Sequence, residues 1–289
     1  MSLLRFFLLF LLLPNILVAQ MLDTKNGDPL SDEPFFDDEF IKWQKINGLK
    51  GFIIYMLADG TIVNTNYNVG YKFDKEGRLI QQYETIQDDG SKDTTWNFYT
   101  YDEHSRIVEH QKCFGKKCSS YLEEYDTNGF IQIQQELHMD DTGKSELIYR
   151  DSITTYYNDS LVIQKYFNNS GAYFCTEETQ LDYMKRPLSK LKRYFYSTDL
   201  WNETNIYNSE GKLWEKNTFE GTNSIPVKKS TYTYDSEGSL IKQELFKNGA
   251  LYNEKEFLYN KNHILESIIS QDYETGKVTI IRFSELRFN

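Results

Sequence analysis

The sequence predicts an all-β fold, a long antiparallel meander of about eighteen strands in repeated β-hairpins that form a curved or curled sheet. Three observations support this prediction. A Tyr-Asp-x-x-Gly motif recurs along the chain, and a second series of turn signals alternates with it. The chain is also 16% aromatic and has only five prolines, which is typical of strand-rich proteins. Helical periodicity is absent beyond residue 19, so strands are expected throughout.

The clearest copy of the motif is residues 232–241, which read Tyr-Thr-Tyr-Asp-Ser-Glu-Gly-Ser-Leu-Ile. Tyr-x-Tyr places two rings on one face of a strand, and Asp-x-x-Gly supplies a type I turn that ends at a positive φ. In a three-residue loop of this kind Asp235 pairs with Ser239, so we expect Tyr234 opposite Leu240. This cross-strand pair is the expected unit of stabilisation, worth roughly 0.2–1 kcal/mol.

Eight copies recur at intervals of about 24 to 32 residues, a period that indicates a repeat architecture. Two copies keep the spacing but replace the glycine with Ser105 and His263. The copy at Tyr157 is shortened, and the copy at Tyr183 is interpreted as having lost both the acid and the glycine. A bend in the sheet is expected at these two. The marker aromatic residues of the copies are Phe73, Tyr101, Tyr125, Tyr157, Tyr183, Tyr207, Tyr234 and Tyr259.

This pattern resembles the YD repeat of bacterial Rhs and related wall-associated proteins, from about Gly51 to the C-terminus. The resemblance implies an exported bacterial repeat protein built from β-hairpins. Large Rhs proteins also carry a toxic domain and a shell-closing plug region. Nothing in this sequence looks like either, so the resemblance implies a building style and no activity.

The chain is expected to have three parts. Residues 1–19 read as a secretory signal peptide, with Arg5, an apolar run over 6–13 and Ala19 at the cleavage site. The mature chain is then expected to begin at Gln20 and to be exported to the periplasm or cell surface. The alternative, an uncleaved anchor, is opposed by the shortness of the apolar run. Residues 20–49 form an acidic, largely disordered segment, and residues 50–289 form the YD-like hairpin repeat domain.

Aromatic and acidic residues alternate at the end of the N-terminal segment. These aromatic residues are candidates for docking on a partner, and the alternative is that they fold back onto the first strands. They are Phe35, Phe36, Phe40 and Trp43.

A formal net charge of −11 argues against nucleic acid or an anionic membrane surface as a partner, because both need basic clusters. No membrane span is expected after signal cleavage, since segments such as 253–256 place charge on both faces of a strand.

Cys113 and Cys118 flank the turn over residues 114–117 and are expected to form a disulfide across a hairpin, with Cys175 left over. A metal site of these two cysteines with His110 is the alternative, but the sequence offers no second Cys/His pair at zinc-site spacing. No metal and no cofactor are expected.

The sequence carries no catalytic motif, and its four histidines are scattered, so it is not expected to be an enzyme. Two functions remain. The first is a non-catalytic interaction or scaffold protein of the bacterial cell envelope, which binds a protein partner with its repeat β-sheet surface. The alternative is a glycan-binding module in which Trp96, Trp201 and Trp214 stack on sugar rings, although these tryptophans could instead be core residues.

Overall fold

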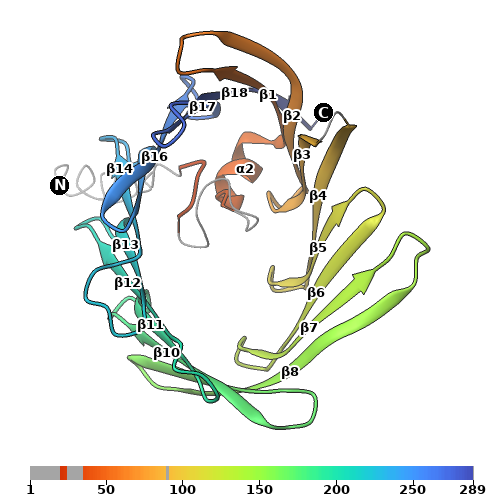
Figure 1. Cartoon of the computed structure of the whole chain (residues 1–289), viewed down its shortest axis with the longest axis vertical. Helices are drawn as coiled ribbons and strands as arrows, with labels where there is room; N and C mark the ends of the chain where they lie inside the picture. Colours follow the sequence, from red (N-terminus) through yellow and green to blue (C-terminus); the bar gives the residue numbers. More distant parts are fainter. Residues whose placement is uncertain (1–19, 25–34, 89–90, 289) are drawn as a thin grey trace, which may run out of the picture.

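The computed structural model describes residues 20–24, 35–88 and 91–288, and its 18 strands within these residues form one antiparallel sheet. The strands follow the circumference of a barrel in chain order (Figure 1). The expected signal peptide, residues 1–19, lies outside the described residues. No helix in the described part of the chain is long and apolar enough to cross a membrane.

Each strand is joined to the next by a hairpin turn. The strands are β1 (Ile46–Met56), β2 (Ile62–Phe73), β3 (Leu79–Asp88), β4 (Ser91–Tyr101), β5 (Ile107–Phe114), β6 (Lys117–Tyr125), β7 (Ile131–Met139), β8 (Ser145–Tyr157), β9 (Leu161–Phe167), β10 (Tyr173–Leu181), β11 (Pro187–Tyr194), β12 (Leu200–Tyr207), β13 (Leu213–Glu220), β14 (Lys228–Tyr234), β15 (Leu240–Lys247), β16 (Ala250–Tyr259), β17 (Leu265–Asp272) and β18 (Val278–Arg287).

The sheet closes on itself, because β1 pairs with β18 as well as with β2. Ile53 lies opposite Ile281 in the closing pair. The predicted all-β meander is confirmed, but the expected curved or curled sheet is wrong in one respect, since no open edge remains in the barrel. Closure pairs the backbone groups that the two edges of such a long sheet would otherwise expose.

The hairpin predicted around the clearest repeat is confirmed. Tyr234 lies opposite Leu240, and the Asp235 amide donates to the carbonyl of Ser239 at 3.0 Å. The Asp235 carboxylate accepts from the Ser239 amide at 2.9 Å, which explains the aspartate of the motif. Gly238 has φ 90°, and Ser105 takes a similar φ of 62° at the corresponding position of its copy.

The copy around Tyr183 differs from its interpretation. Leu181 lies opposite Pro187, so Leu181 is the marker and Asp182 is the retained acid. Lys185 occupies the glycine position with φ 64°, while Tyr183 is 89% exposed in the turn. The assignment of Tyr183 as the marker of this copy is therefore wrong by two positions.

Tyrosine hydroxyls connect neighbouring repeats. In five copies the marker tyrosine donates to a backbone carbonyl of the preceding repeat at 2.7–2.9 Å, and in four a cationic side chain of the preceding turn lies over the ring. The hydroxyl bonds join Tyr101 to Leu79, Tyr125 to Ile107, Tyr207 to Pro187, Tyr234 to Leu213 and Tyr259 to Leu240. The cations are Arg78, Arg106, Arg186 and Lys212. These turns share one end of the barrel, called here the Tyr-Asp end.

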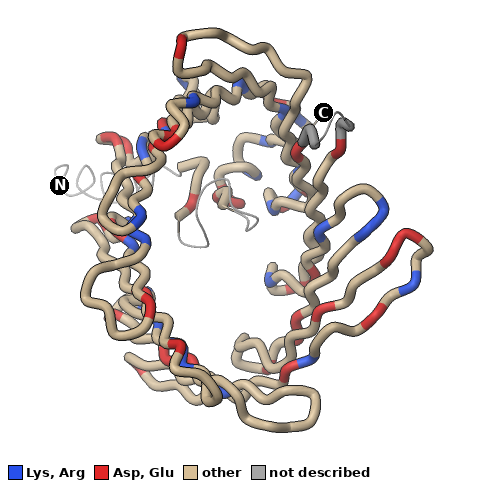
Figure 2. Tube along the Cα trace, in the orientation of Figure 1, with Lys and Arg blue, Asp and Glu red and all other residues tan. Residues whose placement is uncertain are grey.

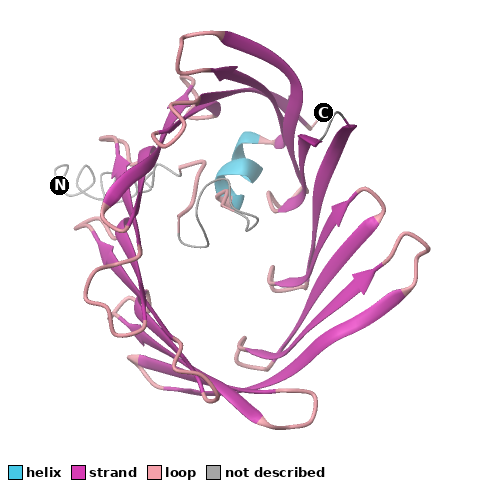
Figure 3. Ribbon diagram, viewed as in Figure 1, coloured by secondary structure: helices cyan, strands magenta, loops and turns pink. Residues whose placement is uncertain are grey.

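The N-terminal residues 20–24 and 35–44, called here the lumen segment, lie inside the barrel (Figures 1 and 3). Residues 20–24 contact β14 and β17, and the helix that follows lies near β1–β3. Helix α2 (Asp38–Gln44) begins where the Asp37 side chain accepts a hydrogen bond from the Phe40 amide at 2.8 Å. Leu22 and Phe36 form an isolated β-bridge.

Part of the N-terminal segment is ordered in the structure. Phe35, Phe36 and Phe40 are 0%, 4% and 1% exposed, and the repeat domain begins at Ile46 instead of residue 50. Residues 35–49 were expected to be largely disordered because of their acidic composition. Their aromatic side chains instead pack on the inner wall, where Phe36 contacts Tyr71 and Phe73 of β2, in line with the alternative that they fold back onto the first strands. Residues 25–34 of the same expectation lie outside the described residues.

Candidate binding site in the barrel lumen

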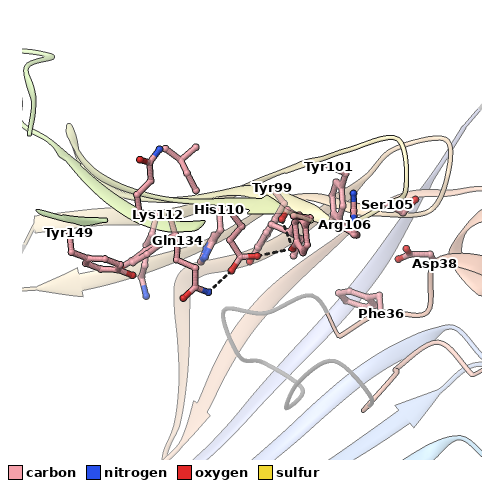
Figure 4. A pocket seen from close by; sticks show the side chains of 16 residues that line it. Phe36, Asp38, Tyr99, Tyr101, Ser105, Arg106, His110, Lys112, Gln134 and Tyr149 are labelled. Carbon is pink, nitrogen blue, oxygen red and sulfur yellow. Dashed lines mark hydrogen bonds between the residues drawn. The ribbon is translucent and has the colours of Figure 1, made fainter. Parts of the chain in front are cut away.

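A cavity of about 770 Å³ lies between the lumen segment and the inner wall of β4–β8 (Figure 4). Phe36 and Asp38 line it from the lumen segment, and Tyr99, His110 and Tyr149 line it from the wall. Side chains alternate between the two faces of a strand, so the buried Tyr99 identifies which residues of β4 and β5 face inward. The wall presents both aromatic and polar groups to the cavity.

One transverse row of side chains crosses the cavity wall. Tyr99 lies opposite His110, which lies opposite Tyr121, and the row continues through Glu136 to Tyr149. The rings of Tyr99 and His110 stack at 4.9 Å, and those of His110 and Tyr121 at 5.8 Å. The Nε2 atom of His110 lies 3.0 Å from the side-chain oxygen of Asn97, so this ring is also held by a polar contact along the wall. This row offers hydrogen-bonding groups at the spacing of the strands.

A polar cluster lies beside the row. The Glu123 carboxylate accepts hydrogen bonds from the Tyr125 hydroxyl at 2.7 Å and from the Gln134 amide at 3.1 Å (Figure 4). Burial raises the pKa of the Tyr125 hydroxyl, and its hydrogen bond to Glu123 adds to the shift. The Arg106 guanidinium lies 4.4 Å from the centre of the Tyr125 ring. The cluster is thus held in place by contacts among its own members.

A second cavity of about 820 Å³ lies at the start of α2 and is largely acidic. Burial raises the pKa of the Asp38 carboxyl to about 6, and the carboxylates of Asp37 and Asp74 add to the shift. Lys42 and Glu76, which both line this cavity, form an ion pair at 2.7 Å. Within the described residues no group of three His, Cys, Asp or Glu side chains is placed to hold a metal ion.

The outer wall of β13–β16 carries ion pairs, both between neighbouring strands and within β15. Lys229 contacts Glu215 at 2.7 Å, and Lys242 contacts both Glu244 and Glu254 at 3.1 Å. These residues alternate with inward-facing ones such as Tyr232, which is 2% exposed, so they face outward. Figure 2 shows charged positions of both signs distributed around the barrel.

The three tryptophans proposed for sugar stacking do not form one site. Trp96 is half-buried on the outer wall of β4, and Trp214 is 57% exposed on the outer wall of β13, across the barrel in Figure 1. Trp201 pairs with Lys192, whose ammonium lies 5.2 Å from the centre of the buried Tyr166 ring, so Trp201 faces inward. A sugar site can therefore include only one of them.

The docking candidates and the cysteines are also placed. Phe35, Phe36 and Phe40 pack inside the barrel, while Trp43 is 74% exposed. Cys113 and Cys118 lie opposite each other on β5 and β6 and are joined by a disulfide. Cys175 is buried and outside this bond.

Sequence reasoning missed the wall of the cavity. Tyr99, Tyr121 and Glu123 share the period-two spacing of their strands, which was visible in the sequence. That spacing separates the two faces of a strand but does not say which face becomes the lumen.

No protein-family model and no curated protein matches the sequence. A porin-like protein from Bacteroides uniformis is similar in structure, with a TM-score of 0.40 and 10% identity over 83% of this chain and 98% of the other. The Tc holotoxin pore of Photorhabdus luminescens has a TM-score of 0.32 and 14% identity over 75% of this chain, and the match spans 12% of the toxin chain. A β-barrel-like protein from Brucella abortus has a TM-score of 0.25 and 11% identity over 84% of this chain and 98% of the other. None of these TM-scores reaches 0.5, so the likenesses assign no function, and the resemblance to YD repeats stays a prediction.

Proposed function

We propose that this chain is an exported, non-catalytic interaction protein of the bacterial cell envelope, and that its barrel lumen holds a polypeptide segment of a protein partner. The observation that carries the proposal is that the inner wall already buries a polypeptide, the lumen segment of the same chain. The proposal replaces the expected outer repeat surface with the inner wall as the binding surface.

The contacts of the lumen segment show what the inner wall can bind. Phe36 packs edge-on against Tyr71 and Phe73, each with ring centres 5.0 Å apart. On the far side of the segment, the Thr24 hydroxyl is 3.1 Å from the Tyr234 hydroxyl, and the Leu265 amide contacts the Met21 sulfur. Aromatic burial and a few side-chain hydrogen bonds therefore hold a polypeptide here.

The adjoining cavity has similar chemistry. It continues from Phe36 along the row of Tyr99, His110 and Tyr121, and a volume of about 770 Å³ is in the range of ligand pockets. A partner segment with aromatic and polar side chains would meet rings, hydroxyls and the Glu123 carboxylate there. This supports a polypeptide occupant beside the lumen segment.

The outer wall supports a water-facing location for the barrel. A strand face in contact with lipid is apolar, whereas the outer faces of β13–β16 carry ion pairs such as Lys229 with Glu215. A water-filled compartment outside the cytoplasm fits the expected signal peptide and the disulfide together. Export is tested by mass spectrometry of fractions from the native host. A mature N-terminus at Gln20 is expected outside the cytoplasm, and a cytoplasmic protein with an intact leader would contradict export.

The lumen site is tested by site-specific photo-crosslinking in the native host. A benzoylphenylalanine in place of Tyr149 should form an adduct with a second polypeptide, because Tyr149 lines the cavity. The matched control replaces Phe246 on the outer wall of β15, which should give no such adduct. Equal adducts from both positions, or none from Tyr149, would overturn the proposal.

A further inference from the structure

Three aromatic side chains gather on the outer wall of β3 and β4, called here the outer platform. They are Tyr83, Trp96 and Phe98. The ring centres of Tyr83 and Trp96 are 5.0 Å apart, and the rings of Trp96 and Phe98 are 6.1 Å apart and parallel within 9°. Phe98 is 37% exposed, and the other two rings are half-buried. Tyr99, the next residue of β4, faces the lumen, so the platform lies on the opposite face of the wall from the cavity.

The Tyr83 ring lies flat on the sheet because its cross-strand partner is Gly70. A Cβ atom on Gly70 would come within 2.2 Å of the Tyr83 ring, so the ring occupies the space that any other side chain would fill. One face of this ring covers the backbone of β2, and the other face is directed away from the sheet. A flat ring face of this kind is the surface on which the apolar C–H face of a sugar packs.

The side chains that flank Phe98 in its own row are amides, and charged side chains lie one strand further out, with Lys72 opposite Gln81 and Lys50 opposite Gly70. Phe98 lies between Gln81 and Gln111 in one transverse row, and the Gln111 amide donates to the Ser120 hydroxyl at 3.1 Å. Amide and hydroxyl groups can both donate and accept, which suits a ligand that carries hydroxyls of both roles.

The disulfide lies next to the platform. Trp96 is paired with Cys113, which is bonded to Cys118 on the following strand. A cross-link between β5 and β6 restricts the movement of these strands relative to each other. Trp96 has the Tyr83 ring on one side and Cys113 on the other, so the disulfide restrains the strand on the side without a ring.

We propose that the outer platform is a carbohydrate-binding site that takes an uncharged glycan chain, with Tyr83, Trp96 and Phe98 packing against sugar rings and Gln81 and Gln111 hydrogen-bonding their hydroxyls. The site goes beyond the lumen function proposed above, since it uses the other face of the wall and another class of ligand. The net charge of −11 favours a neutral chain over an acidic one.

The test is affinity electrophoresis of the full-length exported protein through native gels that contain dextran, mannan, mixed-linkage β-glucan or alginate. At least one of the three neutral polysaccharides should retard the protein, and the acidic alginate should not. Trp96→Ala should weaken the apparent affinity by at least tenfold, which corresponds to about 1.4 kcal/mol. Trp214→Ala, which removes an exposed tryptophan from the opposite outer wall, should leave the retardation unchanged.

A second variant keeps the test decisive. Phe98→Ala removes a more exposed ring, so it replaces Trp96→Ala if circular dichroism shows that the latter fails to fold. The absence of retardation by all three neutral polysaccharides would overturn the proposal, as would equal retardation of the platform variant and Trp214→Ala. Neither outcome affects the crosslinking expected from Tyr149, so the two proposals fail separately.

Discussion

The Tyr234 hydroxyl donates a hydrogen bond to the backbone carbonyl of Leu213 at 2.7 Å, and thereby ties one repeat to the one before it. The same hydroxyl is 3.1 Å from the Thr24 hydroxyl of the lumen segment. A single oxygen thus connects two repeats of the wall with the polypeptide inside it.

Removal of this hydroxyl is expected to destabilise the barrel. Tyr234→Phe should lower the free energy of unfolding by about 1–2 kcal/mol, because it leaves buried hydrogen-bonding groups without a partner. Tyr183→Phe is the matched control, since Tyr183 is 89% exposed in a turn, and it should change stability by less than about 0.5 kcal/mol. Chemical denaturation measures both, and equal effects would contradict the inter-repeat role of the hydroxyl.

The turns give a second prediction. Gly238→Val should cost about 1–2 kcal/mol or more, because φ is 90° and a Cβ atom would clash with the Lys212 ammonium. Ser105→Ala should cost much less, since that turn already holds a non-glycine residue at φ 62°. Ser105→Gly should stabilise the protein by roughly 0.5–1 kcal/mol through relief of strain. Equal small losses for Gly238→Val and Ser105→Ala would mean that the repeat frame is wrong.

The sequence predicts the hairpin turns but not the closure of the barrel. The pairing of Tyr234 with Leu240 and the turn at Asp235 follow from local chemistry, because a three-residue loop with a terminal glycine has one favoured register. Closure of the barrel does not follow from local chemistry. It depends on the sum of small twists over the whole sheet and on the pairing of β1 with β18, which no short stretch of sequence encodes.

The candidate site was predictable to a smaller extent. The alternation of Tyr99 with Phe98 separates two faces, but both faces carry aromatic residues, so hydrophobicity alone does not identify the lumen. The lumen segment was misjudged for a different reason. Its acidic composition indicates disorder in isolation, whereas Phe35 and Phe36 pack on Tyr71 and Phe73 of β2, in line with the alternative that these aromatic residues fold back onto the first strands.

Docking of the lumen segment is tested by truncating one of its rings. Phe36→Ala should destabilise the protein by about 3–4 kcal/mol, because Phe36 is 4% exposed and contacts both Tyr71 and Phe73. Trp43→Ala removes a larger ring from the same segment but one that is 74% exposed, so its effect should stay below about 0.5 kcal/mol. Thermal unfolding of the two variants measures this difference, and the reverse order would show that the segment is not docked.

Asp38 predicts a dependence of stability on pH. Its pKa is raised from 3.8 to about 6 by burial and by Asp37 and Asp74, so the folded state binds its proton more tightly than the unfolded state does. This contribution to stability is complete below pH 3.8 and is lost as the pH rises through 6. Asp38→Asn should therefore stabilise the protein at pH 7 by about 1 kcal/mol, after allowance for solvent screening of a partly exposed carboxyl.

The difference between Asp38→Asn and the wild-type chain should disappear at pH 4. Comparison of the two proteins cancels the titration of the other carboxylates. A difference that is constant from pH 4 to pH 7 would contradict the assignment to Asp38.

The disulfide is tested on protein recovered from outside the cytoplasm. Non-reducing peptide mapping should find Cys113 joined to Cys118, with Cys175 joined to neither, because the two lie opposite each other across a short turn. Replacing both cysteines with serine should cost roughly 2 kcal/mol, as expected for a short closed loop. Recovery of all three as free thiols would contradict the prediction.

Pairing of β1 with β18 sets the order in which the molecule can be completed. During synthesis β1 emerges early, yet one of its two edges has no partner until the last strand arrives. A nascent chain would thus carry two unsatisfied strand edges until its last strand is made, and such edges pair with other chains. A variant that lacks β18 should keep one unpaired edge on β1 and one on β17, and we expect it to aggregate.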